Sequence, residues 1–189
     1  YDKPASYWEE ALPVGNGRIA AMVFGNPQLE QIQLNEETVS AGSPYQNYNE
    51  EAKTALPEMR RLIFEGKYEE AQNMAATKIL SQVGNEMPYQ TVGRLNIRYQ
   101  DHKKVNNYYR DLDISNAVAV TRYKVDGVEY TEETFASFTD QLVIRHIKAS
   151  KPGTINCELF FNTPMRDPKR SIYGKKGLRL EGITHGSRY

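Results

Sequence analysis

The stretch that decides the fold is Asn116–Ser137, which reads NAVAVTRYKVDGVEYTEETFAS. It contains two runs rich in β-branched and aromatic residues, Asn116–Val125 and Val128–Ser137, separated only by Asp126-Gly127. An Asp-Gly pair between two such runs is typical of a tight β-hairpin, because both central residues of the favoured turn need a positive φ angle. The stretch therefore predicts a pair of antiparallel strands.

Further strand patterns lie on both sides of this hairpin. Ile32 and Leu34 fall on one face of a strand, while the intervening glutamines fall on the other, as in a half-buried strand. Short strands separated by turn residues are typical of an antiparallel β-sandwich, so the fold class is expected to be mainly β. The additional strands are expected at Arg18–Phe24, Gln28–Leu34, Val92–Tyr99, Gln141–Ala149 and Thr154–Asn162, with a weak strand at Leu178–Leu180.

The segment from about residue 47 to about residue 80 has a helical period instead. Leu56-Pro57-Glu58 places a proline near an expected helix start, where its missing N–H is harmless, and Gly66 is an expected stop. A second helix is expected at Lys67–Leu80. Because 189 residues fit one domain with a modest insertion, we expect a helical hairpin inserted into the β-sandwich.

Composition excludes several classes of function. Lys plus Arg and Asp plus Glu number 24 each, so the basic excess of a nucleic-acid-binding protein is missing. No apolar run is long enough to span a bilayer. His102, His146 and His185 do not occur at metal-ligand spacing, and the lone Cys157 offers no thiolate cluster. We therefore expect no metal, no cofactor, no nucleic-acid partner and no membrane span, and we expect Cys157 to be buried.

The segment Gly15–Ala20, GNGRIA, matches the short GxGxxA pattern of dinucleotide-binding proteins. That site requires a buried strand before the glycines and a helix after them, whose N-terminus meets the pyrophosphate. Here Pro13 interrupts the approach, and Ile19–Phe24 has the pattern of a strand. The segment is therefore predicted to be a turn between strands and not a nucleotide site.

Pairs of carboxylates carry out glycosidic hydrolysis, about 5–5.5 Å apart in retaining enzymes and about 6.5–9.5 Å apart in inverting ones. Neighbours on a strand point to opposite faces, and neighbours on a helix diverge by about 100°, so most adjacent pairs are excluded. Glu36-Glu37 follows a strand and has either a place at a cleft or a solvated, capping role. No catalytic residue is predicted in this chain. The adjacent pairs are Glu9-Glu10, Glu36-Glu37, Glu50-Glu51, Glu69-Glu70 and Glu132-Glu133.

Blocks of sequence in order along nearly the whole chain carry a family resemblance. They are Tyr1–Ala5, Trp8–Ile19, Ala21–Gly25, Ile32–Thr38, Pro88–Gly93, Tyr109–Asp113 and Tyr130–Gln141. Together they resemble the N-terminal region of glycoside hydrolase family 95. Where members of that family usually continue Leu-Trp-Ser-Gly, this sequence has Val39-Ser40-Ala41-Gly42, without the tryptophan.

The resemblance implies that residues 1–189 form the N-terminal β-sandwich domain, of the supersandwich type, of a larger bacterial glycoside hydrolase. It implies a partner within the same polypeptide, a C-terminal (α/α) barrel that holds the catalytic groups. The implied reaction is hydrolysis of terminal α-1,2-linked L-fucosides in oligosaccharides with inversion, and L-galactosides are the alternative substrates. The implied location is periplasmic or secreted.

Within this chain, the residues expected to touch substrate are Asn16, Asn35, Glu36 and Gln90. Side-chain amides both donate and accept hydrogen bonds, which suits sugar hydroxyls; turn formation and capping are their alternative roles. The chain alone is expected to be inactive, because acid and base catalysis need two positioned groups. Two other functions stay open: a carbohydrate-binding module with exposed aromatic residues, and a purely structural domain that packs on the barrel.

Overall fold

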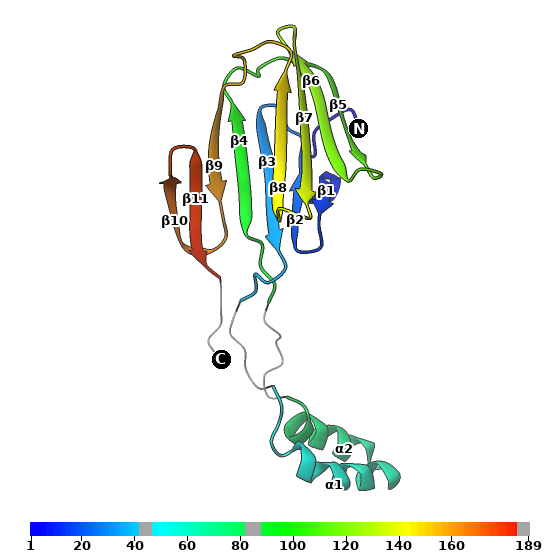
Figure 1. Ribbon diagram of the computed structural model, residues 1–189. Coiled ribbons are helices and arrows are strands. Elements are labelled where there is room, and N and C mark those ends of the chain that lie inside the picture. The colour runs from blue at the N-terminus through cyan, green and yellow to red at the C-terminus, as the bar shows by residue number, and fades with distance from the viewer. Residues whose placement is uncertain (42–46, 82–87, 185–189) are drawn as a thin grey trace. The chain divides into compact units, whose positions relative to one another are not determined.

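The computed structural model describes residues 1–41, 47–81 and 88–184 of the chain. The chain divides into two compact units, one formed by Tyr1–Ser40 with Tyr89–His185 and the other built around Ala41–Pro88. The first unit contains the strands and the second contains the two α-helices (Figure 1). The helical unit is therefore an insertion in the sequence of the β unit.

Two antiparallel sheets make up most of the β unit. The first has the order β1-β2-β3-β4-β9, and the second has the order β5-β6-β7-β8. The strands of the first sheet are β1 (Leu12–Gly15), β2 (Ile19–Val23), β3 (Leu29–Glu36), β4 (Gly93–Tyr99) and β9 (Cys157–Asn162). Those of the second are β5 (Val105–Asp113), β6 (Val118–Val125), β7 (Val128–Ser137) and β8 (Leu142–Ala149). A single 3₁₀ turn, η1 (Trp8–Glu10), precedes β1.

The predicted hairpin is confirmed by the pairing of β6 with β7, which closes at Val125 and Val128. Asp126 and Gly127 between them have φ angles of 47° and 81°, as the turn requires. The two sheets pack face to face around one main apolar cluster, to which β2, β3 and β4 contribute Val23, Ile32 and Ile97. The prediction of a mainly β antiparallel sandwich is therefore confirmed.

Three strands were not predicted from the sequence pattern. β1 contains Pro13, which a sheet tolerates because β1 is an edge strand. β5 has an irregular register between Asn106 and Tyr109, which hides its alternation. β10 (Arg166–Tyr173) is exposed along its whole length and, within the described residues, pairs only with β11 (Gly177–Ile183), which is longer than the expected weak strand. Because neither face of β10 is buried, its sequence has no alternation of apolar and polar residues, and only backbone pairing with β11 identifies it as a strand.

The helical unit contains the predicted helical hairpin. Its helices are α1 (Ala52–Phe64) and α2 (Tyr68–Met74), and α2 continues as one π-helical segment, η2 (Ala75–Ile79). Gly66 between them has a φ angle of 74°, in agreement with its predicted role as a stop. No helix in the described parts of the chain is long and apolar enough to cross a membrane.

The start of the first helix differs from the expectation, because Pro57 lies inside α1 and not at its start. Asn49 organises an earlier first turn: its carbonyl accepts from Ala52 N at 3.0 Å, and its Oδ1 accepts from Glu51 N at 3.0 Å. The proline lacks the N–H that would have donated to the preceding turn, and its ring crowds the carbonyl there, so α1 tolerates it at a cost.

Cys157 is the first residue of β9 and is half-buried against the main apolar cluster. Burial raises the pKa of its thiol. This side chain therefore packs as a small apolar group, somewhat less enclosed than predicted.

Candidate functional site

The predicted turn between β1 and β2 is organised by the side chain of Asn16. Its Oδ1 accepts from Arg18 N at 3.0 Å and from Ile19 N at 2.9 Å, which fixes the turn. Its Nδ2 donates to the carbonyl of Ser137 at 2.7 Å, at the end of β7 in the opposite sheet. A strand follows this turn, as predicted, and no helix is there to receive a pyrophosphate. Asn16 is 6% exposed, so it ties the two sheets together at this end.

Glu36 ends β3 next to the same turn, since Ile19 and Glu36 are register partners. Its carboxylate accepts from Thr38 Oγ1 at 2.6 Å, Thr38 N at 2.9 Å and Arg18 Nε at 3.0 Å. These bonds, that from Thr38 first and that from Arg18 second, lower the pKa of Glu36. The group is therefore a carboxylate at neutral pH and is not poised to donate a proton.

The other two predicted residues lie at the same end of the first sheet. Asn35 precedes Glu36 in β3 and pairs with Ala20. Gln90 donates its backbone N–H to Val39 at 3.0 Å. The neighbouring Tyr89 forms a β-bridge with Ser40 and donates its hydroxyl to the carbonyl of Glu36 at 3.3 Å. The fold thus brings Asn16, Asn35, Glu36 and Gln90 together from three separate segments; we call this region the loop end.

The loop end offers hydrogen-bonding groups but no acid–base pair. Glu36 is held by Arg18 and Thr38, and Arg18 remains largely exposed, at 59% of its side chain. Tyr89, 57% exposed, adds an aromatic face that its hydroxyl bond holds in place. Such a surface can bind a polar ligand, but hydrolysis requires a second, proton-donating carboxyl group. That these residues touch substrate stays a prediction.

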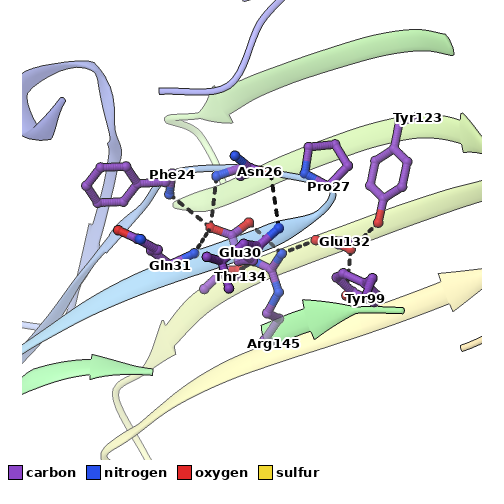
Figure 2. A network of polar contacts seen from close by, with 12 residues as sticks. Phe24, Asn26, Pro27, Glu30, Gln31, Tyr99, Tyr123, Glu132, Thr134 and Arg145 are labelled. Atoms are coloured by element: carbon purple, nitrogen blue, oxygen red, sulfur yellow. Dashed lines mark hydrogen bonds and ion pairs between the residues drawn. The ribbon is translucent and has the colours of Figure 1, made fainter. Parts of the chain in front are cut away.

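A second polar cluster, which the sequence did not reveal, lies between the sheets (Figure 2). Glu30 of β3 and Glu132 of β7 both contact Arg145 of β8, Glu30 at 2.9 Å from its Oε2 to Arg145 Nη2. Arg145 Nη1 also donates to Thr134 Oγ1 at 2.8 Å. Glu30 and Glu132 are 0% and 1% exposed, so this buried ion cluster is closed to solvent.

Both carboxylates of the buried ion cluster have further partners. Glu30 Oε1 accepts from the backbone N–H groups of Phe24, Gly25 and Gln31 at 3.1, 2.9 and 3.0 Å (Figure 2). Glu132 Oε1 accepts the hydroxyls of Tyr99 and Tyr123 at 2.7 and 2.6 Å. Buried polar groups must find such partners, because an unpaired buried charge is strongly destabilising.

Burial shifts the pKa values of several side chains in and beside this cluster. Two carboxylates share one guanidinium, and burial raises the pKa of Glu30 to about 6, with Glu132 adding to the rise and Arg145 opposing it. Burial and the charge of Glu132 also raise the pKa values of Tyr99 and Tyr123. His102 stacks on Tyr99 with ring centroids 4.4 Å apart, and burial lowers its pKa.

The two carboxylates of this cluster do not form a hydrolytic pair. Arg145 lies between them, and their oxygens are already occupied by protein donors, so no water or sugar oxygen has a place there. Glu132 and Glu133 point to opposite faces of β7, as predicted, with only Glu132 buried. The one sequence signal for the cluster was a charged residue on the apolar face of a strand, shared by Glu30 and Glu132.

Among the residues described, no group of three or more His, Cys, Asp or Glu side chains could hold a metal ion. His146 lies on the exposed face of β8, with its Nδ1 3.4 Å from Glu133. His185 lies outside the described residues.

The fold and the loop end define an antiparallel β-sandwich domain with a polar surface at one end and without an acid–base pair among the residues described. Residues 1–188 match the family described as "Glycosyl hydrolase family 65, N-terminal domain", and the chain belongs to this family. It is an N-terminal domain of a glycoside hydrolase.

Three curated relatives carry α-fucosidase names. The chain is 38% identical over 165 residues to "Alpha-L-fucosidase 2" of Arabidopsis thaliana, an alignment that covers 86% of this chain and 19% of the relative. It is 26% identical over 159 residues to "Probable alpha-fucosidase A" of Aspergillus niger, covering 79% of this chain and 19% of that protein. For the protein of the same name from Aspergillus oryzae, identity is 24% over 197 residues, 97% of this chain and 26% of the relative. The chain therefore spans about a fifth to a quarter of these relatives.

Proposed function

We propose that this chain is the non-catalytic N-terminal domain of a family 95 glycoside hydrolase that releases terminal α-1,2-linked L-fucose with inversion. The α-fucosidase names of the relatives support the substrate class. The short share of each relative that the chain spans supports a further catalytic domain, proposed to be an (α/α) barrel in the same polypeptide. We further propose a bacterial, periplasmic or secreted enzyme, on the sequence resemblance alone.

The non-catalytic role rests on one observation: the carboxylates that could act as an acid–base pair are buried or bound by cationic side chains. Where two of them converge, at Glu30 and Glu132, they are buried and bridged by Arg145. At the loop end, Glu36 accepts from Arg18 and Thr38, and its pKa is lowered. An inverting hydrolase needs one protonated and one ionised carboxyl group facing each other with room for a water. The catalytic pair must then come from the rest of the enzyme.

The proposed contribution of this chain to the site is a polar wall at the loop end. Asn35, Glu36 and Gln90 are half-buried at this end of the first sheet and carry amide and carboxylate groups, which suit recognition of sugar hydroxyls. Asn16, 6% exposed, fixes the turn beside them. Tyr89 beside them offers a face on which a sugar ring can stack.

The test compares the intact protein with residues 1–189 alone, each incubated with 2′-fucosyllactose. We expect fucose release by the intact protein only, and NMR of the first product should show the inverted anomer. Turnover by residues 1–189 would contradict the non-catalytic role. An intact protein that releases galactose from an L-galactoside but no fucose would contradict the proposed sugar.

A further inference from the structure

The four edge strands of the two described main sheets differ in how they are protected against pairing with another strand. β1 is short and carries Pro13, which cannot donate to a neighbouring strand. β5 has the register irregularity between Asn106 and Tyr109, and Asn107 there has a φ angle of 51°. On β9, Arg170 Nε donates to the carbonyl of Phe161 at 2.9 Å. Three of the four edges therefore carry a feature that interrupts further pairing.

The fourth edge, β8, is regular throughout. It pairs with β7 at eight consecutive positions, from Leu142 to Ala149, without a register shift, and it contains no proline. β8 ends the second sheet in the described part of the chain, so its outer backbone N–H and C=O groups form an open row. A long, flat edge of this kind is a template for one more strand.

The inner face of the first sheet is only partly covered next to this edge, where Ile172 and Leu178 of the β10–β11 hairpin line a pocket with Leu159. β8 lies over β2 and β3, because it packs on β2 and its Arg145 reaches Glu30. Figure 1 shows β4 and β9 continuing the first sheet beyond β8, with no strand of the second sheet in front of β9. Leu159 of β9 is consequently 47% exposed, although its register partner Ile97 is only 3% exposed. Phe161 on the same face is half-buried.

We infer that, in the intact protein, an extended segment of the same polypeptide from beyond residue 189 pairs with the edge of β8 and covers Leu159 and Phe161. This inference rests on the proposed function, in which the chain is one part of a longer enzyme. The segment alternates apolar and polar residues, because one of its faces meets β9 and the other meets solvent. The relatives, of which the chain spans only about a fifth to a quarter, are long enough to supply it.

A second copy of this chain is a poorer occupant of the same edge. Lys148 and His146 lie on the outer face of β8, where Glu133 of β7 is their partner. Antiparallel pairing of two β8 strands across a two-fold axis would bring the lysines and histidines of both copies near one another. A different sequence avoids this repulsion.

The experiment uses the intact protein and two substitutions, Leu159→Lys on β9 and the control Ile114→Lys in the turn after β5. Ile114 is 85% exposed, so its replacement should leave the melting temperature within about 1 °C. Leu159→Lys should lower it by about 5 °C or more, because the covering segment would bury the ammonium group. Hydrogen exchange of the β8 amides provides the second measurement: all of them, on both sides of the strand, should be slow in the intact protein.

The outcomes are distinct. Alternate β8 amides that exchange within seconds, together with a Leu159→Lys variant as stable as Ile114→Lys, would overturn the inference. Protection of β8 that rises with protein concentration would assign the edge to a second copy and would overturn it as well. Fucosidase activity is measured on the same samples, so loss of the proposed function and loss of the added strand are told apart.

Discussion

Two glutamates of this protein show how burial and hydrogen bonding shift the pKa of the same side chain. Glu30 and Glu36 belong to the same strand, yet their pKa values move in opposite directions. Glu36, at the surface, is surrounded by donors from Thr38 and Arg18 that favour the ionised form. Glu30 has three backbone donors and Arg145, but the loss of solvent outweighs them. Position along one strand therefore decides the direction of the pKa shift.

Glu30 gives a prediction on pH dependence. Its pKa is raised from 4.5 to about 6, so the folded chain binds this proton more tightly than the unfolded chain. The resulting stability is fully present below pH 4.5 and is lost as the pH rises through 6. Between about pH 5 and about pH 7.5, the contribution of Glu30 to the free energy of unfolding changes by about 1 kcal/mol.

The lowered pKa of His102 acts in the opposite direction in this window, because the unfolded chain takes up that proton more readily. Glu30 is therefore isolated by comparison with Glu30→Gln, in urea denaturation at both pH values. The substitution should cost about 1 kcal/mol more at pH 5 than at pH 7.5. Glu129→Gln, at an exposed position of β7, is the control and should cost the same at both. An equal cost for Glu30→Gln at the two pH values would contradict the assignment.

At the scale of elements, two turns between strands depend on a glycine. The β6–β7 hairpin and the β2–β3 connection both contain a glycine with positive φ, 81° at Gly127 and 73° at Gly25. Around Gly127 there is open space, whereas a side chain on Gly25 would meet Tyr108 Oη at 2.8 Å and Arg110 Cδ at 3.0 Å. The first turn needs glycine for its conformation only, and the second also needs it for close packing.

Replacing each glycine by alanine separates these two causes. Gly127→Ala should lower the free energy of unfolding by about 1 kcal/mol through backbone strain alone. Gly25→Ala should cost at least about 1 kcal/mol more, because Tyr108 and Arg110 must move and the Tyr108 bond to the Gly25 carbonyl, 2.6 Å long, is disturbed. Thermal or urea denaturation measures both. An equal loss of unfolding free energy in both variants would show that Tyr108 and Arg110 move aside without a cost, and would contradict this prediction.

In the intact enzyme, the loop end is proposed to bind the substrate, and Glu36 is the residue that tests this. Glu36→Gln keeps the shape of the side chain but removes the charge that Arg18 and Thr38 face. If the loop end binds sugar, the variant should raise KM for 2′-fucosyllactose about fivefold, the equivalent of one hydrogen bond, with kcat nearly unchanged. The matched control is Glu158→Gln on β9, an exposed residue that pairs with Arg98 of β4, and it should leave both constants as they are. A fall in kcat with an altered pH profile would instead make Glu36 part of the catalytic machinery.

Local sequence determined most of the strands, the β6–β7 turn and the helical hairpin, because alternation and positive-φ turn residues act over a few neighbouring positions. It did not reveal β1, β5 or β10. Val128–Ser137 is one strand in prediction and in structure alike. Local sequence also placed Asn16 in a turn and Glu132 opposite to Glu133.

Only the tertiary structure decided which distant residues meet. Glu30 and Arg145 are 115 positions apart, and Asn16 lies 121 positions from Ser137, so no local pattern records either contact. The same holds for β8 as an open edge beside a partly covered apolar face, since strand order is a property of the folded sheets. The physical reason is that helix and strand periodicity depends on neighbours in sequence. Burial, and with it the raised pKa of Glu30, depends on neighbours in space.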